Sequence, residues 1–148
     1  MNNILAEAAQ YRKEPRSPIA GMGRELTPDM IAGKLFSFHD RAHFFHLQTT
    51  SYAQHKMLDD LYKSLVDAKD DISEYLLGIQ APQRFTGIVI EQPGEFSQEA
   101  LTIFLDDGFN FSVSLCQYAD TRNLEELCNL ASDLQKLFVR SKYLNTLM

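Results

Sequence analysis

The sequence predicts an all-α domain in which four helices form a bundle, and three observations support this fold. Apolar residues recur at the three- and four-residue spacing of an amphipathic helix in several long segments. Residues that favour helix N-caps stand just before these segments. One long connection with prolines and glycines, residues 79–95, separates the second helix from the third, which gives an up-down-down-up bundle or a close relative.

The composition is that of a single soluble domain. The chain has 148 residues, of which 45% are hydrophobic and 23% charged, and its net charge is −6. This charge argues against a surface that coats nucleic acid, so DNA is not an expected partner. No apolar run approaches the ~18 residues that span a bilayer, so no membrane partner is expected either. With only two cysteines and no signal-peptide core, the sequence favours a reducing, cytoplasmic compartment.

Residues 1–26 differ from the rest of the chain and are predicted to be a flexible N-terminal arm. They contain two prolines and two glycines between residues 15 and 23, and they carry four basic and three acidic side chains. The resulting charge of +1 gives the arm little attraction for DNA. The helical bundle is therefore expected to comprise residues 27–148.

The first helix is predicted to begin at Thr27-Pro28-Asp29. Threonine is a good N-cap, proline suits the first helical position, and aspartate interacts favourably with the positive end of the helix dipole. The apolar stripe that follows consists of Ile31, Leu35, Phe38, Ala42 and Phe45. The polar run of residues 49–51 is expected to end this helix.

The second helix is predicted to begin after Ser51, because Ser51 and Gln54 have the spacing of a capping box. Its apolar face consists of Leu58, Leu61, Leu65, Ala68, Ile72 and Leu76. Gly78 is the expected C-terminal stop, since glycine readily adopts the left-handed conformation found there. The helix would then be about 26 residues long, which is normal in a helical bundle.

The third helix is the least clearly defined element, and it is predicted to start at Ser97. Its apolar positions are Leu101, Phe104, Leu105 and Leu115. Gly108 could end this helix early, and residues 109–115 alternate like a β-strand. Helix is favoured, because a lone strand would find a partner only in residues 85–90. Residues 88–90 are apolar and need cover, within the fold or at an interface.

The last helix is predicted to be capped by Asp120 or Thr121. Its apolar positions are Leu124, Leu127, Cys128, Ala131, Leu134 and Phe138. Cys116 and Cys128 are interpreted as buried packing residues, since neither belongs to a CxxC motif.

Imidazole and carboxylate side chains share one face of the second helix. At about 100° per residue, its histidine end (His55 and Asp59) and its acidic end (Asp70 and Glu74) fall within one stripe about 100° wide. These groups are ligands that suit Fe²⁺, Mn²⁺ and Zn²⁺. The pattern therefore predicts a metal site, and the competing interpretation of the acidic end is a solvated acidic face.

A second copy of the chain is needed to complete such a site, because Asp59 and Asp70 lie about 16 Å apart along the helix axis. An antiparallel copy, related by a two-fold axis near residues 63–65, brings the histidine end of one chain to the acidic end of the other. Two equivalent sites result. Tyr62 and Val66 lie between the two ends and suit an apolar contact at the axis. We therefore expect a two-fold homodimer or a larger homo-oligomer.

Together with the first helix, this face resembles a known family. The spacing His43-x11-His55-x3-Asp59-x10-Asp70-x3-Glu74 is similar to that of the ferroxidase ligands of Dps-type mini-ferritins, within the ferritin-like superfamily. The resemblance implies a ferritin-like four-helix bundle with di-iron sites between two-fold-related subunits. At these sites Fe²⁺ would be oxidised by O₂ or H₂O₂, for iron storage or oxidative protection, with Mn or Zn as other candidate metals.

The run from His46 to His55 is more similar to small ferritin-like proteins of tailed bacteriophages, in which His46 rather than His43 would be the first ligand. The chain also departs from the Dps pattern, because Phe44 stands where that family has tryptophan. His43 and His46 could equally be satisfied polar groups beside the core, and His39 is expected at the rim. The alternative function is a non-enzymatic structural or interaction protein, of phage origin, that keeps the bundle without an active metal site.

Overall fold

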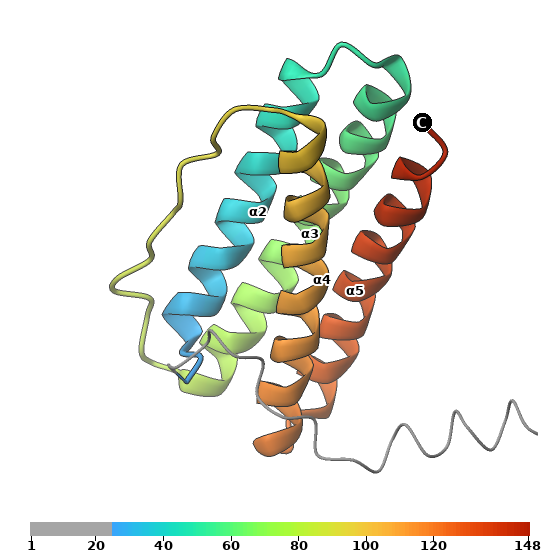
Figure 1. Ribbon diagram of the computed structural model, residues 1–148. Helices are drawn as coiled ribbons and strands as arrows, with labels where there is room; N and C mark the ends of the chain where they lie inside the picture. The colour runs from blue at the N-terminus through green and yellow to red at the C-terminus, as the bar shows by residue number, and fades with distance from the viewer. Residues whose placement is uncertain (1–24) are drawn as a thin grey trace, which may run out of the picture.

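The computed structural model describes residues 25–148, and their helices form a four-helix bundle (Figure 1). The helices are α2 (Pro28–Gln48), α3 (Tyr52–Gln80), α4 (Gln98–Thr121) and α5 (Glu125–Asn145), and the described residues contain no strand. α2 and α5 run in one direction and α3 and α4 in the other, which confirms the predicted up-down-down-up path. Residues 1–24, nearly all of the predicted N-terminal arm, lie outside the described part of the chain.

Side-chain caps set the starts of three helices where the sequence predicts them. The Thr27 hydroxyl accepts a hydrogen bond from the Met30 amide, at 3.2 Å, and the Ser51 hydroxyl accepts one from the Gln54 amide, at 3.3 Å. The Ser97 hydroxyl caps α4 in the same way. Each cap satisfies an amide that has no partner within its helix, which is why these starts can be read from the sequence.

Two predicted boundaries are wrong. α3 continues past Gly78 to Gln80, because Pro82 lacks an amide hydrogen and restricts the residue before it, so the helix ends there. Asp120 and Thr121 do not cap the last helix but form the final turn of α4. α5 begins after Leu124 without a side-chain cap, and the turn between the two helices is made with Asn123 at a positive φ of 55°.

The core consists mainly of apolar side chains and contains a cluster of aromatic rings. The Phe38 ring lies 6.0 Å from Phe104, 5.4 Å from Phe111 and 5.5 Å from Phe138, measured between ring centroids. α4 is a continuous helix through residues 109–115, so the strand alternative is wrong. The reason is packing: Gly108, Phe111 and Leu115 are buried at helical spacing, and one helical face therefore joins the core.

Residues 81–97, named the strap here, connect α3 to α4 and lie along the outside of α2 (Figure 1). The Asp29 carboxylate accepts hydrogen bonds from the Thr86 amide and hydroxyl and from the Gly87 amide. Further along, the Ser37 hydroxyl accepts one from the Glu91 amide, at 2.9 Å. Of the apolar residues 88–90, which were expected to need cover, the first is half-buried and the other two are exposed.

Attachment of the strap should weaken in acid. The hydrogen bonds from the Thr86 and Gly87 amides lower the pKa of Asp29 below its usual 3.8. A carboxylate with a lowered pKa contributes stability above its unfolded pKa and loses that contribution as the pH falls through the folded value. We therefore expect faster hydrogen exchange at the Gly87 amide, relative to its intrinsic rate, below about pH 3.8. Asp29→Asn should give fast exchange already at neutral pH, whereas the exposed control Asp107→Asn should not; equal protection in both variants would contradict the assignment.

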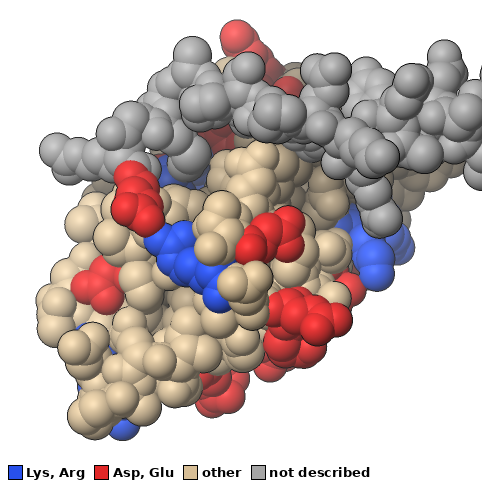
Figure 2. Space-filling view, turned by 90° about the horizontal axis from the view of Figure 1, so that it is seen from below, with Lys and Arg blue, Asp and Glu red and all other residues tan. Residues whose placement is uncertain are grey.

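Charged side chains of both signs lie close together at the end of the bundle where α2 begins. Figure 2 views that end and shows basic side chains bordered by acidic ones. One such pair joins Arg122, at the end of α4, to Glu25 ahead of α2. Leu26 follows and packs against the core. The chain is thus attached to the bundle from Glu25 onward, two residues before the predicted boundary.

Candidate metal centre

All four histidines of the chain lie on the face shared by α2 and α3, and the three histidines of α2 surround Tyr62. The His43 ring stacks on the Tyr62 ring at 4.3 Å between centroids, with an interplanar angle of 22°. His46 and His39 approach the same tyrosine at 5.2 and 6.2 Å. Periodicity predicts the shared face of the three α2 histidines, and the antiparallel packing of α3 adds Tyr62 as their common neighbour.

His46 and His55 are joined by two reciprocal hydrogen bonds across the α2–α3 turn. The Nδ1 atom of His46 lies 3.0 Å from the carbonyl oxygen of His55, and the Nδ1 atom of His55 lies 3.1 Å from the carbonyl oxygen of His46. The two rings stack at 3.8 Å. Because a carbonyl oxygen only accepts, each Nδ1 carries the hydrogen, and in the neutral ring each Nε2 keeps its lone pair. A carbonyl that orients Nδ1–H in this way is typical of histidines that bind metals through Nε2.

Asp59 lies on the same face and is ionised. Its side chain is 17% exposed, and Lys63 donates a hydrogen bond to it at 2.7 Å. That hydrogen bond, followed by the charge of Lys63, holds the pKa of Asp59 below its usual value. Asp60 lies instead toward α5, with 3.8 Å between its carboxylate and the Arg140 guanidinium. Asp59 is therefore the neighbour of His55 that can supply a carboxylate ligand, as the helical geometry predicts.

Within one chain, the acidic end stays apart from the histidine end. Asp70 and Glu74 are exposed side chains further along α3. No three of the predicted ligands offer donor atoms within 4.8 Å of one another in residues 25–148. Within residues 25–148, the predicted ligands of one chain therefore do not come together as a metal centre.

A family model matches residues 46–144. The chain belongs to DUF5856, a family of unknown function. The DUF5856 match begins at His46 and includes His55, Asp59 and the acidic end of α3, while His39 and His43 lie outside it. No curated protein and no solved structure matches the chain. None of the helices in residues 25–148 has the length and hydropathy that a membrane span requires.

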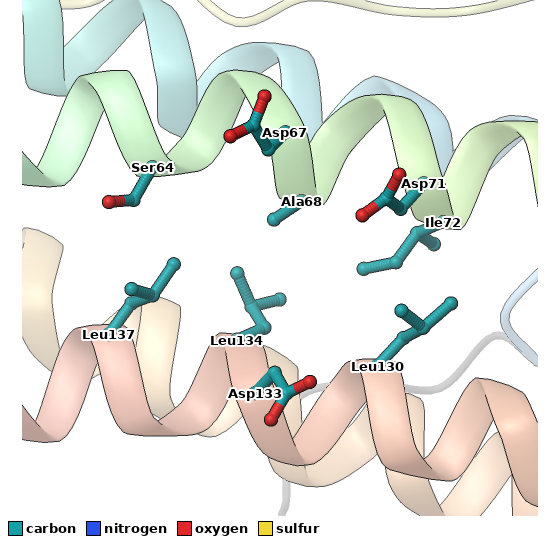
Figure 3. Close-up of a pocket in the computed structure, with 9 residues that line it drawn as sticks. All are labelled: Ser64, Asp67, Ala68, Asp71, Ile72, Leu130, Asp133, Leu134 and Leu137. Atoms are coloured by element: carbon teal, nitrogen blue, oxygen red, sulfur yellow. The ribbon is translucent and has the colours of Figure 1, made fainter.

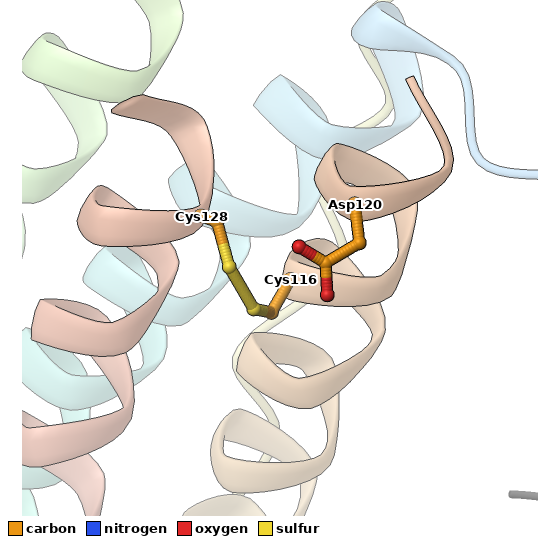
Figure 4. A group of neighbouring side chains, drawn as sticks. All are labelled: Cys116, Asp120 and Cys128. Carbon is orange, nitrogen blue, oxygen red and sulfur yellow. A yellow bond between two sulfur atoms is a disulfide. The ribbon is translucent and has the colours of Figure 1, made fainter. Parts of the chain in front are cut away.

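The interpretation of Cys116 and Cys128 as separate buried packing residues is wrong. They form a disulfide between α4 and α5 of this DUF5856 chain, with 4.6 Å between their Cα atoms, and both side chains are half-buried (Figure 4). Their positions could have indicated the pairing. Each lies six residues from Arg122, at the turn, and residues equidistant from the turn of an antiparallel helical hairpin face one another.

A second surface feature is a hollow of about 210 Å³ between α3 and α5 (Figure 3). Its polar rim includes Asp67, Asp71 and Asp133, and its floor is formed by Ile72, Leu134 and neighbouring apolar side chains. Asp67 and Asp71 thus belong to a different face of α3 from Asp70, although all three are close in sequence.

Proposed function

We propose that the chain is a metal-binding protein that oxidises Fe²⁺ at two equivalent sites of a two-fold homodimer. Each site would combine His46, His55 and Asp59 of one chain with the acidic end of the partner's α3. The observation that carries this proposal is the reciprocal bonding of His46 and His55 through Nδ1, because it leaves both Nε2 atoms as acceptors for a metal.

The exposed residues of the α2–α3 face support a self-contact. Val66 is 41% exposed at the midpoint between the two ends of α3, and Leu47 and Tyr52 are 67% and 79% exposed near the histidine end. Apolar side chains gathered near polar ligands are suited to burial in an interface. Tyr62 lies beside the expected axis, half-buried against His43. His43 is itself exposed and stacked, which fits a position at the edge of the centre better than the role of first ligand.

The ligand set is suited to oxidation of Fe²⁺ as a substrate. Carboxylates neutralise the charge of two neighbouring iron ions, and oriented imidazoles fix the coordination geometry. Two Fe²⁺ supply the two electrons that reduce one H₂O₂, and with two protons the products are two Fe³⁺ and two water molecules. The single long crossover between α3 and α4 is also the connection found in ferritin-like bundles, which supports the proposed relationship to mini-ferritins.

Adjacent aspartates of α3 provide the test. Asp70→Asn should weaken Fe²⁺ binding, measured anaerobically, at least about tenfold and slow iron oxidation, whereas Asp71→Asn on the α3–α5 side should leave both unchanged. Likewise, Asp59→Asn should weaken Fe²⁺ binding and slow iron oxidation, whereas Asp60→Asn should leave both unchanged. Iron binding should also require dimers, detected by light scattering. Equal behaviour of the paired variants, or a monomer at all concentrations, would overturn the proposal.

A structural or interaction protein is the second candidate, and a specific contact favours it. The same two hydrogen bonds close the α2–α3 turn, which is a purely structural role. If that is their only role, His55→Ala should lower the melting temperature while the parent protein binds no Fe²⁺. The second candidate is excluded if the parent protein binds Fe²⁺ and His55→Ala loses this binding while it keeps its helicity.

A further inference from the structure

Three potential ligands meet where α4 packs against the start of α5, on different helices from the proposed iron centre (Figure 4). Cys116 and Asp120 are four residues apart and lie on one face of the last turns of α4. Cys128 lies opposite, in the early part of α5, with its Cα atom 4.6 Å from that of Cys116. The two thiol-bearing positions and the carboxylate therefore face one another across the helical hairpin.

The spacing of the donor atoms suits one metal ion. The two sulfurs and a carboxylate oxygen of Asp120 all lie within 4.8 Å of one another, and this is the one such group of three among residues 25–148. Zinc bonds to sulfur at about 2.3 Å and to carboxylate oxygen at about 2.0–2.2 Å. Once the disulfide is reduced, side-chain rotations can therefore bring both sulfurs and the carboxylate into coordination. Two soft thiolates with one carboxylate favour Zn²⁺ over Mg²⁺ or Ca²⁺.

The position is open to an incoming ion. Asp120 is exposed, and both cysteines are half-buried rather than enclosed in the core. No described residue forms an ion pair with the Asp120 carboxylate, so no cation has to leave before a metal binds. With three protein ligands, the fourth tetrahedral position stays available to water.

We propose that the reduced chain binds one Zn²⁺ through Cys116, Asp120 and Cys128, and that a peroxide releases the ion by closing the disulfide. One thiolate attacks a peroxide oxygen of H₂O₂, the O–O bond breaks, and hydroxide leaves. The second thiolate attacks the resulting sulfenic sulfur, the S–S bond forms, and a second hydroxide leaves. Two protons from solvent convert both hydroxides to water. The two sulfur atoms have then supplied two electrons and no longer hold the metal.

Cobalt makes the experiment specific to sulfur ligands. The full-length chain is reduced, freed of reductant and titrated with Co²⁺, which gives a near-ultraviolet thiolate charge-transfer band only when sulfur binds it. We expect the thiolate band to saturate at one sulfur-bound Co²⁺ per chain, and one Zn²⁺ per chain to displace that ion. Hydrogen peroxide should then release the Zn²⁺ to a chromogenic chelator, with two thiols lost for each ion.

Matched variants assign the ligands. Cys116→Ser should abolish the band, and Asp120→Asn should weaken Zn²⁺ binding at least about tenfold, while the exposed α4 control Asp107→Asn should leave it unchanged. His55→Ala should also leave the band unchanged, which separates this site from the proposed iron centre. Absence of the band in the reduced protein, or its survival in Cys116→Ser, would overturn the proposal. Circular dichroism checks that each variant is folded.

Discussion

Gly108→Ala should lower the free energy of unfolding by roughly 2 kcal/mol, measured by denaturant titration. A Cβ atom at Gly108 would overlap the ring of Phe138, which belongs to the facing helix α5. That ring is fully buried, and the neighbouring rings of Phe38 and Phe104 lie 5.5 and 5.9 Å from it. Because the ring is enclosed, relief of the overlap should require a shift of the ring, of its neighbours or of α4 against α5.

The opposing effect of helix propensity is smaller. Alanine is favoured over glycine in a helix interior by about 1 kcal/mol, and overpacking of a buried site costs typically 1–3 kcal/mol. Gly78→Ala is the matched control, because α3 is helical there and nothing lies within 4 Å of the added Cβ. It should raise stability by up to about 1 kcal/mol.

A compensating change checks the mechanism. Phe138→Leu should destabilise the parent chain but partly relieve the clash in Gly108→Ala, so the two changes should not be additive. If Gly108→Ala is as stable as Gly78→Ala, the close packing of α4 against α5 is contradicted. The same glycine looked like a possible helix stop in the sequence. Its actual role is to let two helices approach closely.

Helix starts were predictable because their determinants are local. The hydroxyls of Thr27, Ser51 and Ser97 each bond an amide three residues away, so a short window of sequence contains the whole interaction. The ends of helices were less predictable. Gly78 allows α3 either to end or to continue, and it is Pro82 that stops the helix. The turn into α5 uses Asn123 in a left-handed conformation, with no side-chain cap to mark it.

The candidate site was predictable as a face but not as a set of contacts. Periodicity places three histidines of α2 on one side of the helix, yet it says nothing of side-chain rotamers. Only packing selects His46, which is 8% exposed, for reciprocal bonding with His55 and leaves His43 stacked outside. The Cys116–Cys128 pair is similar, since it depends on where the α4–α5 turn falls and not on a local motif.

The strap depends on the absence of a side chain at Gly33, and this is the basis of the second large expected effect. A Cβ atom at Gly33 would lie 2.6 Å from the carbonyl oxygen of Val89 and 3.3 Å from its amide nitrogen. Both are backbone atoms, so no rotamer change in the strap relieves the contact. Gly33→Ala should therefore displace the middle of the strap from α2, although the helix itself gains about 1 kcal/mol in propensity.

The expected result of Gly33→Ala is local opening rather than global unfolding. The Glu91 amide bonds the Ser37 hydroxyl, and its carboxylate pairs with Lys34 at 2.8 Å, so both contacts are lost when the strap moves. Protease cleavage within residues 86–92 should become about tenfold faster, which corresponds to about 1.4 kcal/mol in the opening equilibrium. Ser37→Ala removes the hydroxyl contact without adding bulk and should have a smaller effect. If Gly33→Ala is instead cleaved at the parental rate, the middle of the strap does not hold it in place. The strap would then be held by its ends alone. One end is bound by Asp29, and at the other end the Gln48 side chain accepts a hydrogen bond from the Phe96 amide.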